Sequence, residues 1–498
     1  MESLYNRNKT EFETIIQQIP ISDPYMTICT LERSEFDNYQ IIADHFKNII
    51  EKRKQRHDVK TIGLIYYKMD NGGVERVLSL LSDMLSKPGE GKAYKVVVIT
   101  DQKPTPSDYS LPNSVIREVI PSYNICKGNY EIRGSALLNL IEKYDIDVFI
   151  DSLWAEPSVI WDMLTIKTSP KCPAFIIYTH ALYTFLWESR KHMVNAAWKM
   201  FPFADAIITL TDLDKKYWGI INKNTYKLCN PCADNAKSQK NQWKEAPHHI
   251  LWLGRISSEK QPFEIVNIMK RVVRELPNTI CHIVGSEDKI IEEDLKAYIK
   301  ENSLQKNFIM EGFHTDTDKF YRQADIFIST SRYEGFSMTF MEAASYGIPT
   351  VFYDLPWIQY NNIIEGFCKV PQMDTQKAAD AVITLLSDRE KWETSSNLIF
   401  NSFQKFIAHD LRKDWDEIFS NYQNNIHPVT APVDNDVVIG LNRMIEIYDK
   451  VINNKMLENN PAKAELEMVY RSESWKIGQM IVQPLHAVKV KFEKLIRK

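Results

Sequence analysis

Two carboxylates and a glycine form the strongest chemical signal in this chain. Glu334 and Glu342 stand eight positions apart in the segment SRYEGFSMTFMEAA, where Gly335-Phe336 open a predicted helix. A glycine-containing loop at a helix start presents backbone N–H groups that stabilise an anion, and carboxylates accept strongly from hydroxyl groups. The pattern is typical of a site for a diphosphate flanked by hydroxyl-bearing rings. The alternative is a pair of ordinary charges on a surface helix.

Two cations follow a predicted strand further upstream. The apolar run over residues 250–254 ends just before Arg255, and Lys260 follows five residues later. Pro262 then opens a helix, at a position where its missing N–H costs little. Loops at the carboxyl ends of strands bind ligands in open α/β sheets, and Arg and Lys together can neutralise a diphosphate. The alternative is a solvated Arg and Lys on a surface loop.

The first half of the chain offers a second anion site and a histidine. Gly72-Gly73 follow the strand Thr61–Tyr66 and open a helix, as a phosphate or sugar-oxygen contact needs. The third glycine of the dinucleotide fingerprint is absent, and a simple tight turn is the alternative. His180 follows the strand Phe175–Tyr178 and is interpreted either as a structural residue or as a ligand at a strand end.

The elements that position these residues repeat in two stretches of chain. Strands are predicted over 61–66, 94–100, 148–150, 175–178 and 206–210, and again over 250–254, 279–284, 308–311, 326–329 and 350–353. Helical or loop segments separate the strands, and the polar stretch Ala233–Ala246 separates the two sets. Alternating strands and helices predict α/β domains with parallel sheets covered on both faces. We therefore expect two doubly wound, Rossmann-like domains that face each other across a cleft.

Taken as a set, these motifs resemble those of the retaining glycosyltransferases of family 4, which have the GT-B fold. The further matching segments are Ile283–Ser286, Glu311–Phe313, Ala324–Ser331, Gly347–Thr350 and Gly366–Pro371, and the resemblance covers residues 60–425. It implies an acceptor domain over 61–235 and a nucleotide-sugar donor domain over 247–425. It also implies that the helix containing Trp415 crosses back to the first domain.

The resemblance also implies roles for individual residues. The catalytic residues would be Glu334, Arg255, Lys260 and His180, and the donor-binding residues would be Gly72, Gly73, Gly285, Phe313, Gly335, Phe336 and Glu342. Glu334 would hold sugar hydroxyls, Glu342 the ribose and His180 the transferred sugar. The donor would be a UDP-sugar, and neither a cofactor nor a metal is expected because Arg and Lys neutralise the leaving group. The segment Asp354–Trp357 departs from the family's glycine-rich pattern and leaves the sugar undetermined.

The acceptor is expected to be a glycan, glycolipid or glycoprotein of a cell-surface polysaccharide pathway. Asp151, Trp154 and Trp187 could contact an acceptor sugar, and core packing explains the two Trp residues equally well. Two other functions stay open. One is a non-catalytic GT-B subunit that binds a partner enzyme, and the other is a GT-B enzyme of different chemistry, such as a nucleotide-sugar epimerase.

Composition agrees with a protein of this kind. The 498 residues are 44% hydrophobic and 25% charged, and the net charge of −4 gives no case for nucleic-acid binding. No apolar run suits a membrane span, and the first residues lack a signal pattern. Seven scattered cysteines suit a reducing compartment, and Cys229 and Cys232 are interpreted as bystander thiols on a turn. We expect a cytoplasmic protein.

The two flanks lie outside the resemblance. Residues 1–60 form a charged N-terminal extension, and residues 426–498 contain a linker and a basic amphipathic tail. From Arg471 onward, seven Lys or Arg stand against two Glu, a net charge of +5. Such a helix can lie on an anionic membrane, which would suit a lipid-linked acceptor at the inner face of the cell membrane. A solvated face on a packed helix is the alternative.

Overall fold

The structure is a computed structural model that describes two lobes and a crossing helix. The described residues are 43, 44, 47, 58–70, 72–89, 93–123, 130–183, 185–186, 190–232, 240–286, 289–314, 316–332, 334–355 and 364–423. The predictions for residues 426–498, for most of residues 1–60 and for Trp187 concern residues outside this part. No helix in the described ranges is both long and apolar enough to cross a membrane.

The first lobe is a seven-stranded parallel sheet in the order β3-β2-β1-β4-β5-β6-β7. Its strands are β1 Thr61–Tyr66, β2 Lys95–Thr100, β3 Ile116–Val119, β4 Val148–Asp151, β5 Ala174–Tyr178, β6 Ala206–Thr209 and β7 Thr225–Lys227. Its α-helices are α5 Gly73–Ser86, α6 Tyr130–Tyr144, α7 Ser158–Lys167, α9 Lys191–Met200 and α10 Asp212–Trp218. Two apolar clusters cover the two faces of the sheet, which is why the central strands are continuous apolar runs.

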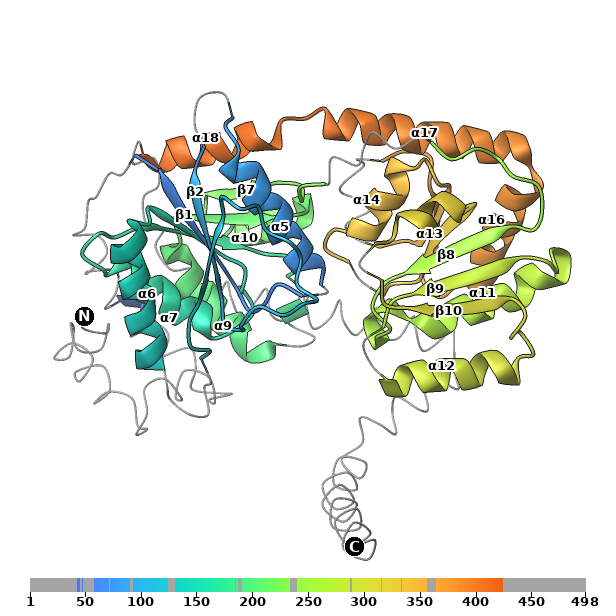
Figure 1. The fold of residues 1–498 in the computed structure, drawn as a ribbon, viewed down its shortest axis with the longest axis horizontal. Helices are drawn as coiled ribbons and strands as arrows, with labels where there is room; N and C mark the ends of the chain where they lie inside the picture. The colour runs from blue at the N-terminus through green and yellow to red at the C-terminus, as the bar shows by residue number, and fades with distance from the viewer. Residues whose placement is uncertain are drawn as a thin grey trace, which may run out of the picture.

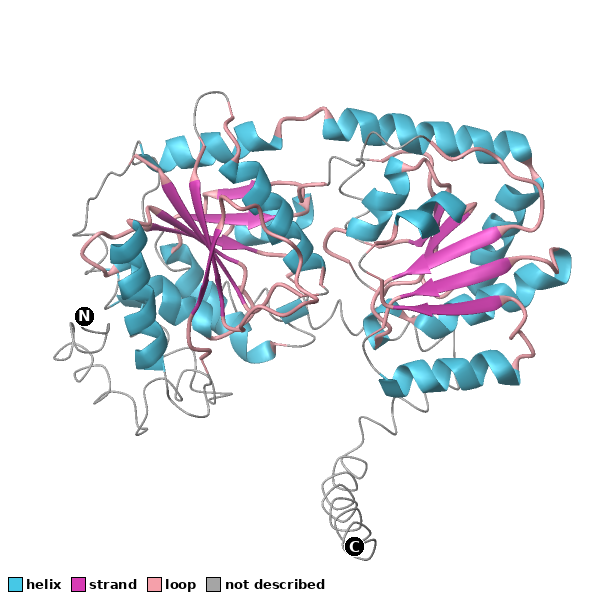
Figure 2. Cartoon of the chain, in the orientation of Figure 1, coloured by secondary structure: helices cyan, strands magenta, loops and turns pink. Residues whose placement is uncertain are grey.

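The second lobe is a six-stranded parallel sheet in the order β10-β9-β8-β11-β12-β13. Its strands are β8 His249–Leu253, β9 Ile280–Val284, β10 Phe308–Gly312, β11 Ile326–Ser329, β12 Thr350–Tyr353 and β13 Cys368–Val370. Its helices are α11 Pro262–Glu275, α12 Lys289–Glu301, α13 Asp318–Gln323, α14 Met338–Ser345, α16 Thr375–Ser387 and α17 Arg389–Ile407. Figure 2 shows the two sheets as separate layers, each flanked by helices.

Helix α11 shows how the sequence specifies these layers. Pro262 occupies its first turn, as predicted, and the helix starts where the proline fixes the backbone. The side chains of Ile265, Ile268, Met269 and Val272 recur at helical spacing and are fully buried against the second sheet.

Helix α18 (Leu411–Gln423) joins the lobes by crossing back to the first one (Figure 1). The ring of Phe419 meets the ring of Tyr94 edge-on, with 5.3 Å between their centres. The Tyr94 hydroxyl also donates to Asp416 at 2.6 Å, and Trp415 is fully buried. The crossing expected for this helix is therefore confirmed.

The strand order reverses at one point in each sheet. In the first sheet the reversal lies between β1 and β4, and in the second it lies between β8 and β11. Ligands bind outside the carboxyl ends of strands at such points, because the connecting loops diverge there. The loops after these four strands carry most of the predicted site, and the predicted doubly wound α/β architecture is confirmed.

Candidate functional site

An ion pair closes the loops that follow β8 and β11. The Nζ atom of Lys260 lies 2.5 Å from Oε1 of Glu334, and Ser331 donates to the same oxygen at 2.8 Å. The hydroxyl of Thr330 donates to the Lys260 carbonyl at 2.8 Å, which fixes the two loops against each other. The side chains of Lys260 and Glu334 are 20% and 11% exposed, so the ion pair is partly shielded from water. The structure thus brings together two residues that lie 74 positions apart.

Arg255 occupies the same loop and is close enough to the first lobe to affect the pKa values of two groups there. Its guanidinium donates to Glu259 at 2.9 Å, and the Glu259 carbonyl accepts from the N–H of Arg332 at 2.8 Å. The charge of Arg255 opposes the rise in pKa of both Tyr66 and Glu75, which belong to the first lobe. Because such effects fade with distance, Arg255 lies in the neighbourhood of Tyr66 and Glu75.

Bare backbone lines the strand ends next to Arg255. Gly285 has a φ of 135°, and a Cβ there would come within 1.9 Å of the Gly254 carbonyl oxygen. Only glycine fits this close approach. The Gly285 N–H donates to the Gly312 carbonyl at 2.8 Å, so three strand ends are tied together. Phe313 follows with 44% of its surface exposed, and its ring is available to a planar ligand.

Helix α14 begins later than the sequence suggested. Ser337 is its N-cap and accepts from the N–H of Phe340 at 3.2 Å, so the helix starts at Met338. The prediction that Gly335-Phe336 open the helix is wrong by two to three residues, because the serine side chain caps the first turn. Phe336 is also buried, and it packs near Phe406 with 6.3 Å between ring centres. Only its backbone faces a ligand site.

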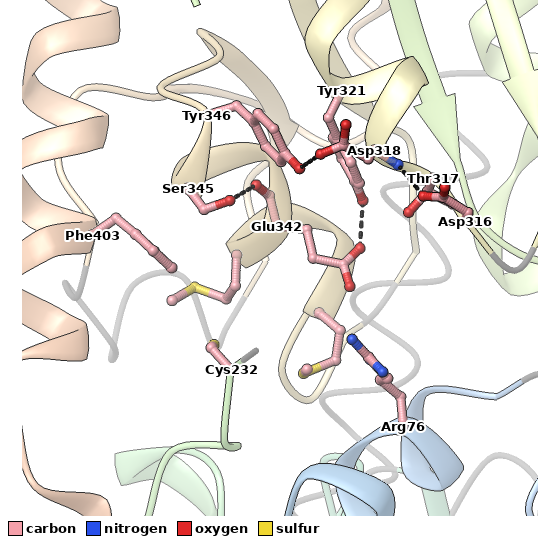
Figure 3. A pocket seen from close by; sticks show the side chains of 12 residues that line it. Arg76, Cys232, Asp316, Thr317, Asp318, Tyr321, Glu342, Ser345, Tyr346 and Phe403 are labelled. Atoms are coloured by element: carbon pink, nitrogen blue, oxygen red, sulfur yellow. Dashed lines mark hydrogen bonds between the residues drawn. The ribbon is translucent and has the colours of Figure 1, made fainter. Parts of the chain in front are cut away.

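Glu342 lies on the second turn of α14 in the wall of a pocket. Its Oε2 accepts from the Tyr321 hydroxyl at 2.7 Å, and burial raises the pKa of its carboxyl above the ordinary value. Figure 3 shows the carboxylate directed into the pocket, opposite Arg76 from α5. The pocket is lined by residues of both lobes.

The two lobes touch at Gly335 and His180. A Cβ on Gly335 would lie 2.7 Å from the His180 carbonyl oxygen and 2.9 Å from the Cα of Ala181. Nε2 of His180 lies 2.9 Å from the Ser152 hydroxyl, and burial lowers the pKa of the ring to about 3. His180 is therefore a neutral hydrogen-bonding group beside the Glu334 loop.

The glycine pair before α5 has a neighbour that the sequence analysis missed. Gly72 is the N-cap of α5, and a Cβ on it would come within 1.9 Å of a carboxylate oxygen of Glu75. Glu75 is 4% exposed, and burial raises its pKa to about 7. The sequence signal for Glu75 is an acidic residue three positions after the N-cap Gly72, in the first turn of the helix. An anion at Gly72-Gly73 has to share this helix start with the Glu75 carboxyl.

Two residues considered as acceptor contacts are buried in the core, which is the alternative given for Trp154. Asp151 is fully buried and accepts from the Leu153 N–H at 2.7 Å. Trp154 is 4% exposed and packs against Phe185 and Trp218. Asp151 ends β4 and Trp154 lies in the loop after it, and burial keeps both side chains from an acceptor sugar. Among the described residues, no group of three or more His, Cys, Asp or Glu could hold a metal ion.

A model of a known protein family matches most of the second lobe. Residues 234–404 match the family model for glycosyl transferases group 1. This segment of the chain is similar to group 1 glycosyl transferases. The matched range contains Arg255, Lys260, Glu334 and Glu342, whereas Gly72, Gly73 and His180 precede it.

Two relatives that are named as glycosyltransferases match parts of this chain. The chain is 27% identical over 191 residues to the poly(glycerol-phosphate) alpha-glucosyltransferase of Bacillus subtilis, covering 38% of this chain and 27% of that one. It is 24% identical over 292 residues to the amylovoran biosynthesis glycosyltransferase AmsD of Erwinia amylovora, covering 57% and 78%. The chain thus spans about a quarter of the length of the first relative.

Two solved structures share the fold of this chain. TarM superposes with a TM-score of 0.59 at 12% identity, covering 73% of this chain and 99% of TarM. HepE of Anabaena, solved in complex with UDP-glucose, superposes with a TM-score of 0.58 at 14% identity, covering 73% and 99%. The predicted GT-B fold is therefore confirmed.

Proposed function

We propose that this chain is a retaining glycosyltransferase of family 4 that moves a sugar from a UDP-sugar to a glycan, glycolipid or glycoprotein acceptor. The carrying observation is the 2.5 Å Lys260–Glu334 pair at the reversal point of the second sheet. Two relatives, a poly(glycerol-phosphate) alpha-glucosyltransferase and an amylovoran biosynthesis glycosyltransferase, support cell-surface polysaccharide synthesis as the setting.

In this proposal, the cations of the β8 loop stabilise the leaving diphosphate. Negative charge grows on the diphosphate as its bond to the sugar breaks, and fixed positive groups stabilise that charge without reorganisation. Lys260 has three N–H donors, so it can bind a phosphate oxygen while Glu334 still holds it. Arg255 adds a forked donor on the same loop, and the start of α14 adds backbone N–H groups.

The carboxylates take the hydroxyl groups of the UDP-sugar. Glu334 lies beside the Lys260 ammonium and would accept from the transferred sugar. Glu342 lies deeper in the pocket and would accept from the ribose, with Tyr321 holding it in place. Phe313, at the exposed end of β10, would stack on the base.

Retention of configuration follows from attack on the face that the diphosphate leaves. The acceptor hydroxyl forms the new bond to the sugar as the bond to phosphate breaks, and the leaving phosphate takes the hydroxyl proton. Neutral His180 would hold a hydroxyl of the transferred sugar, since its ring does not become charged at physiological pH. No pair of carboxylates acts as in a hydrolase.

Nucleotide release from UDP-, GDP- and ADP-sugars tests this proposal, because hydrolysis of the sugar donor needs no knowledge of the acceptor. We expect release from one nucleotide class, and a decrease of about 100-fold or more in Lys260→Ala. Lys300→Ala is the matched control, because Lys300 is an exposed residue at the end of α12. It should release nucleotide at the wild-type rate.

Two results would contradict retaining transfer. Absence of both release and nucleotide binding would leave the non-catalytic GT-B subunit. A changed sugar nucleotide without any acceptor would indicate an epimerase.

A further inference from the structure

The pocket beside Glu342 contains a cation that belongs to the other lobe. Arg76 and Cys232 come from the first lobe, whereas Tyr321, Met338 and Glu342 come from the second. Arg76 lies on the first turns of α5, which faces the second lobe in Figure 1. Figure 3 shows its side chain extended toward the Glu342 carboxylate.

The guanidinium of Arg76 has no hydrogen bond or ion pair with any residue in the described part of the chain. Its nearest aromatic contact is the ring of Tyr109, with 5.5 Å from the guanidinium carbon to the ring centre. Its charge opposes the effect of burial on the Glu342 pKa, so the two groups are close enough to interact. They do not form a direct pair, and the Tyr321 hydroxyl occupies one oxygen of Glu342.

Two arginines that are buried elsewhere in the described residues already have partners. Arg133 donates to Asp162 and Asp101 and is fully buried. Arg412 donates to three backbone carbonyls at the end of α5. Arg76 is partly exposed, and its guanidinium offers five N–H donors that no group in the described part of the chain accepts. Arg76 is therefore arranged for a partner that enters the pocket.

The groups around Arg76 define the chemistry of that partner. A carboxylate that accepts from hydroxyls and a guanidinium that donates to anions lie on opposite walls of one pocket. Met338, which also lines the pocket, is the first residue of α14, whose N-terminal N–H groups add positive potential. A ribose 5′-phosphate carries hydroxyls at one end and an anion at the other, and thus complements all three groups.

We propose that Arg76 is a donor-binding residue supplied by the first lobe, and that its guanidinium binds the phosphate attached to the ribose, the α-phosphate of the nucleoside diphosphate, while Glu342 holds the ribose. This inference rests on the proposed function. It makes donor binding a contact between lobes, because the phosphate would be held by α5 on one side and by α14 on the other. A bound nucleotide would then favour the arrangement in which Gly335 meets His180.

Isothermal titration calorimetry on the full chain tests the inference. The wild type is first titrated with UDP, GDP and ADP, and the base that binds is then tested as diphosphate, monophosphate and nucleoside. We expect Arg76→Met to weaken the diphosphate and the monophosphate by about tenfold or more and to leave the nucleoside unchanged. Arg76→Lys should recover part of the lost affinity, because lysine keeps the positive charge but lacks the forked N–H donors of a guanidinium.

The control is Arg389→Met, which removes a surface arginine paired with Glu393 on α17 and should bind every ligand as the wild type does. Because Arg76 has no polar partner among the described residues, its variants should also keep the wild-type thermal transition. Equal binding of the monophosphate by wild type and Arg76→Met would overturn the inference, as would an equal loss for the nucleoside. Absence of binding by the wild type would instead overturn the proposed function.

Discussion

Three carboxyl groups share one electrostatic feature and differ in what they face. Burial raises the pKa values of Glu75, Asp151 and Glu342. Glu342 opens on a pocket and can meet a ligand, whereas Glu75 is 4% exposed at the start of α5. Asp151 is enclosed in the first lobe, with Asp162 and Asp101 adding to the rise in its pKa. A perturbed pKa therefore identifies a ligand site only where the group is also accessible.

Asp151→Asn should stabilise the protein at neutral pH. The folded state holds the Asp151 proton above the ordinary pKa, whereas the unfolded chain releases it near pH 4, so folding stability falls as pH rises from there through the folded value. The amide oxygen can still accept from the Leu153 N–H. Urea denaturation at several pH values should show a gain for the variant that grows from about pH 4 upward. A pH-independent difference would contradict this account.

Glycines at strand ends act at the scale of whole elements. Gly285 lets the loop after β9 lie against the loop after β8, which contains Arg255. Gly335 does the same between lobes, by letting the loop before α14 approach His180. In both places backbone occupies the space that a side chain would need. The glycines therefore set the distance between the elements that carry the charged residues.

Gly285→Ala should destabilise the second lobe by about 1–3 kcal/mol, because its Cβ would collide with the Gly254 carbonyl and its φ of 135° disfavours a side chain. Gly73→Ala is the matched comparison for stability. A Cβ at Gly73 has no neighbour within 4 Å, and alanine favours the first turn of α5. Chemical denaturation should give a lower free energy of unfolding for Gly285→Ala than for Gly73→Ala. Equal stability for both would show that the strand end relaxes freely.

At the scale of the molecule, α18 holds the lobes together. Its side chains join an apolar cluster that also contains residues of both sheets, including Val98 and Phe352. Arg412 begins the crossing and donates to the Met84, Leu85 and Lys87 carbonyls at 3.0, 3.3 and 2.9 Å. These carbonyls end α5, the helix whose first turns carry Glu75 and Arg76. The crossing helix thus fixes one end of α5 while the other end faces the pocket.

Arg412→Met should lower the free energy of unfolding by about 1.5–3 kcal/mol, because it removes charged hydrogen bonds to three backbone carbonyls, one of them buried, and keeps the apolar stem. Differential scanning calorimetry should show a lower melting temperature. Arg389→Met serves again as the control. The Arg389 side chain is 68% exposed, so its ion pair with Glu393 contributes little to the free energy of unfolding. A melting temperature unchanged in Arg412→Met would mean that α18 is held by apolar contacts alone.

The strands that the sequence predicted are chiefly those with neighbours on both sides. β1 and β4 are almost entirely buried, so their apolar runs are continuous. The strands β3, β7 and β13 were missed, and all three lie at sheet edges with partly exposed side chains. An edge strand needs fewer apolar residues, because only one side of it pairs. Its position is decided by the neighbouring strand and not by its own composition.

The sequence by itself determined the α/β class, the two halves and the charged loops after β8 and β11, because local periodicity and residue type carry that information. It also carries the similarity of residues 234–404 to group 1 glycosyl transferases, because that segment is one continuous stretch. Only the tertiary structure decided that Lys260 and Glu334 form a pair, that Asp151 and Trp154 are enclosed, and that Arg76 faces Glu342. Those outcomes depend on which distant segments meet, and contact between segments far apart in the chain has no signature in either segment alone.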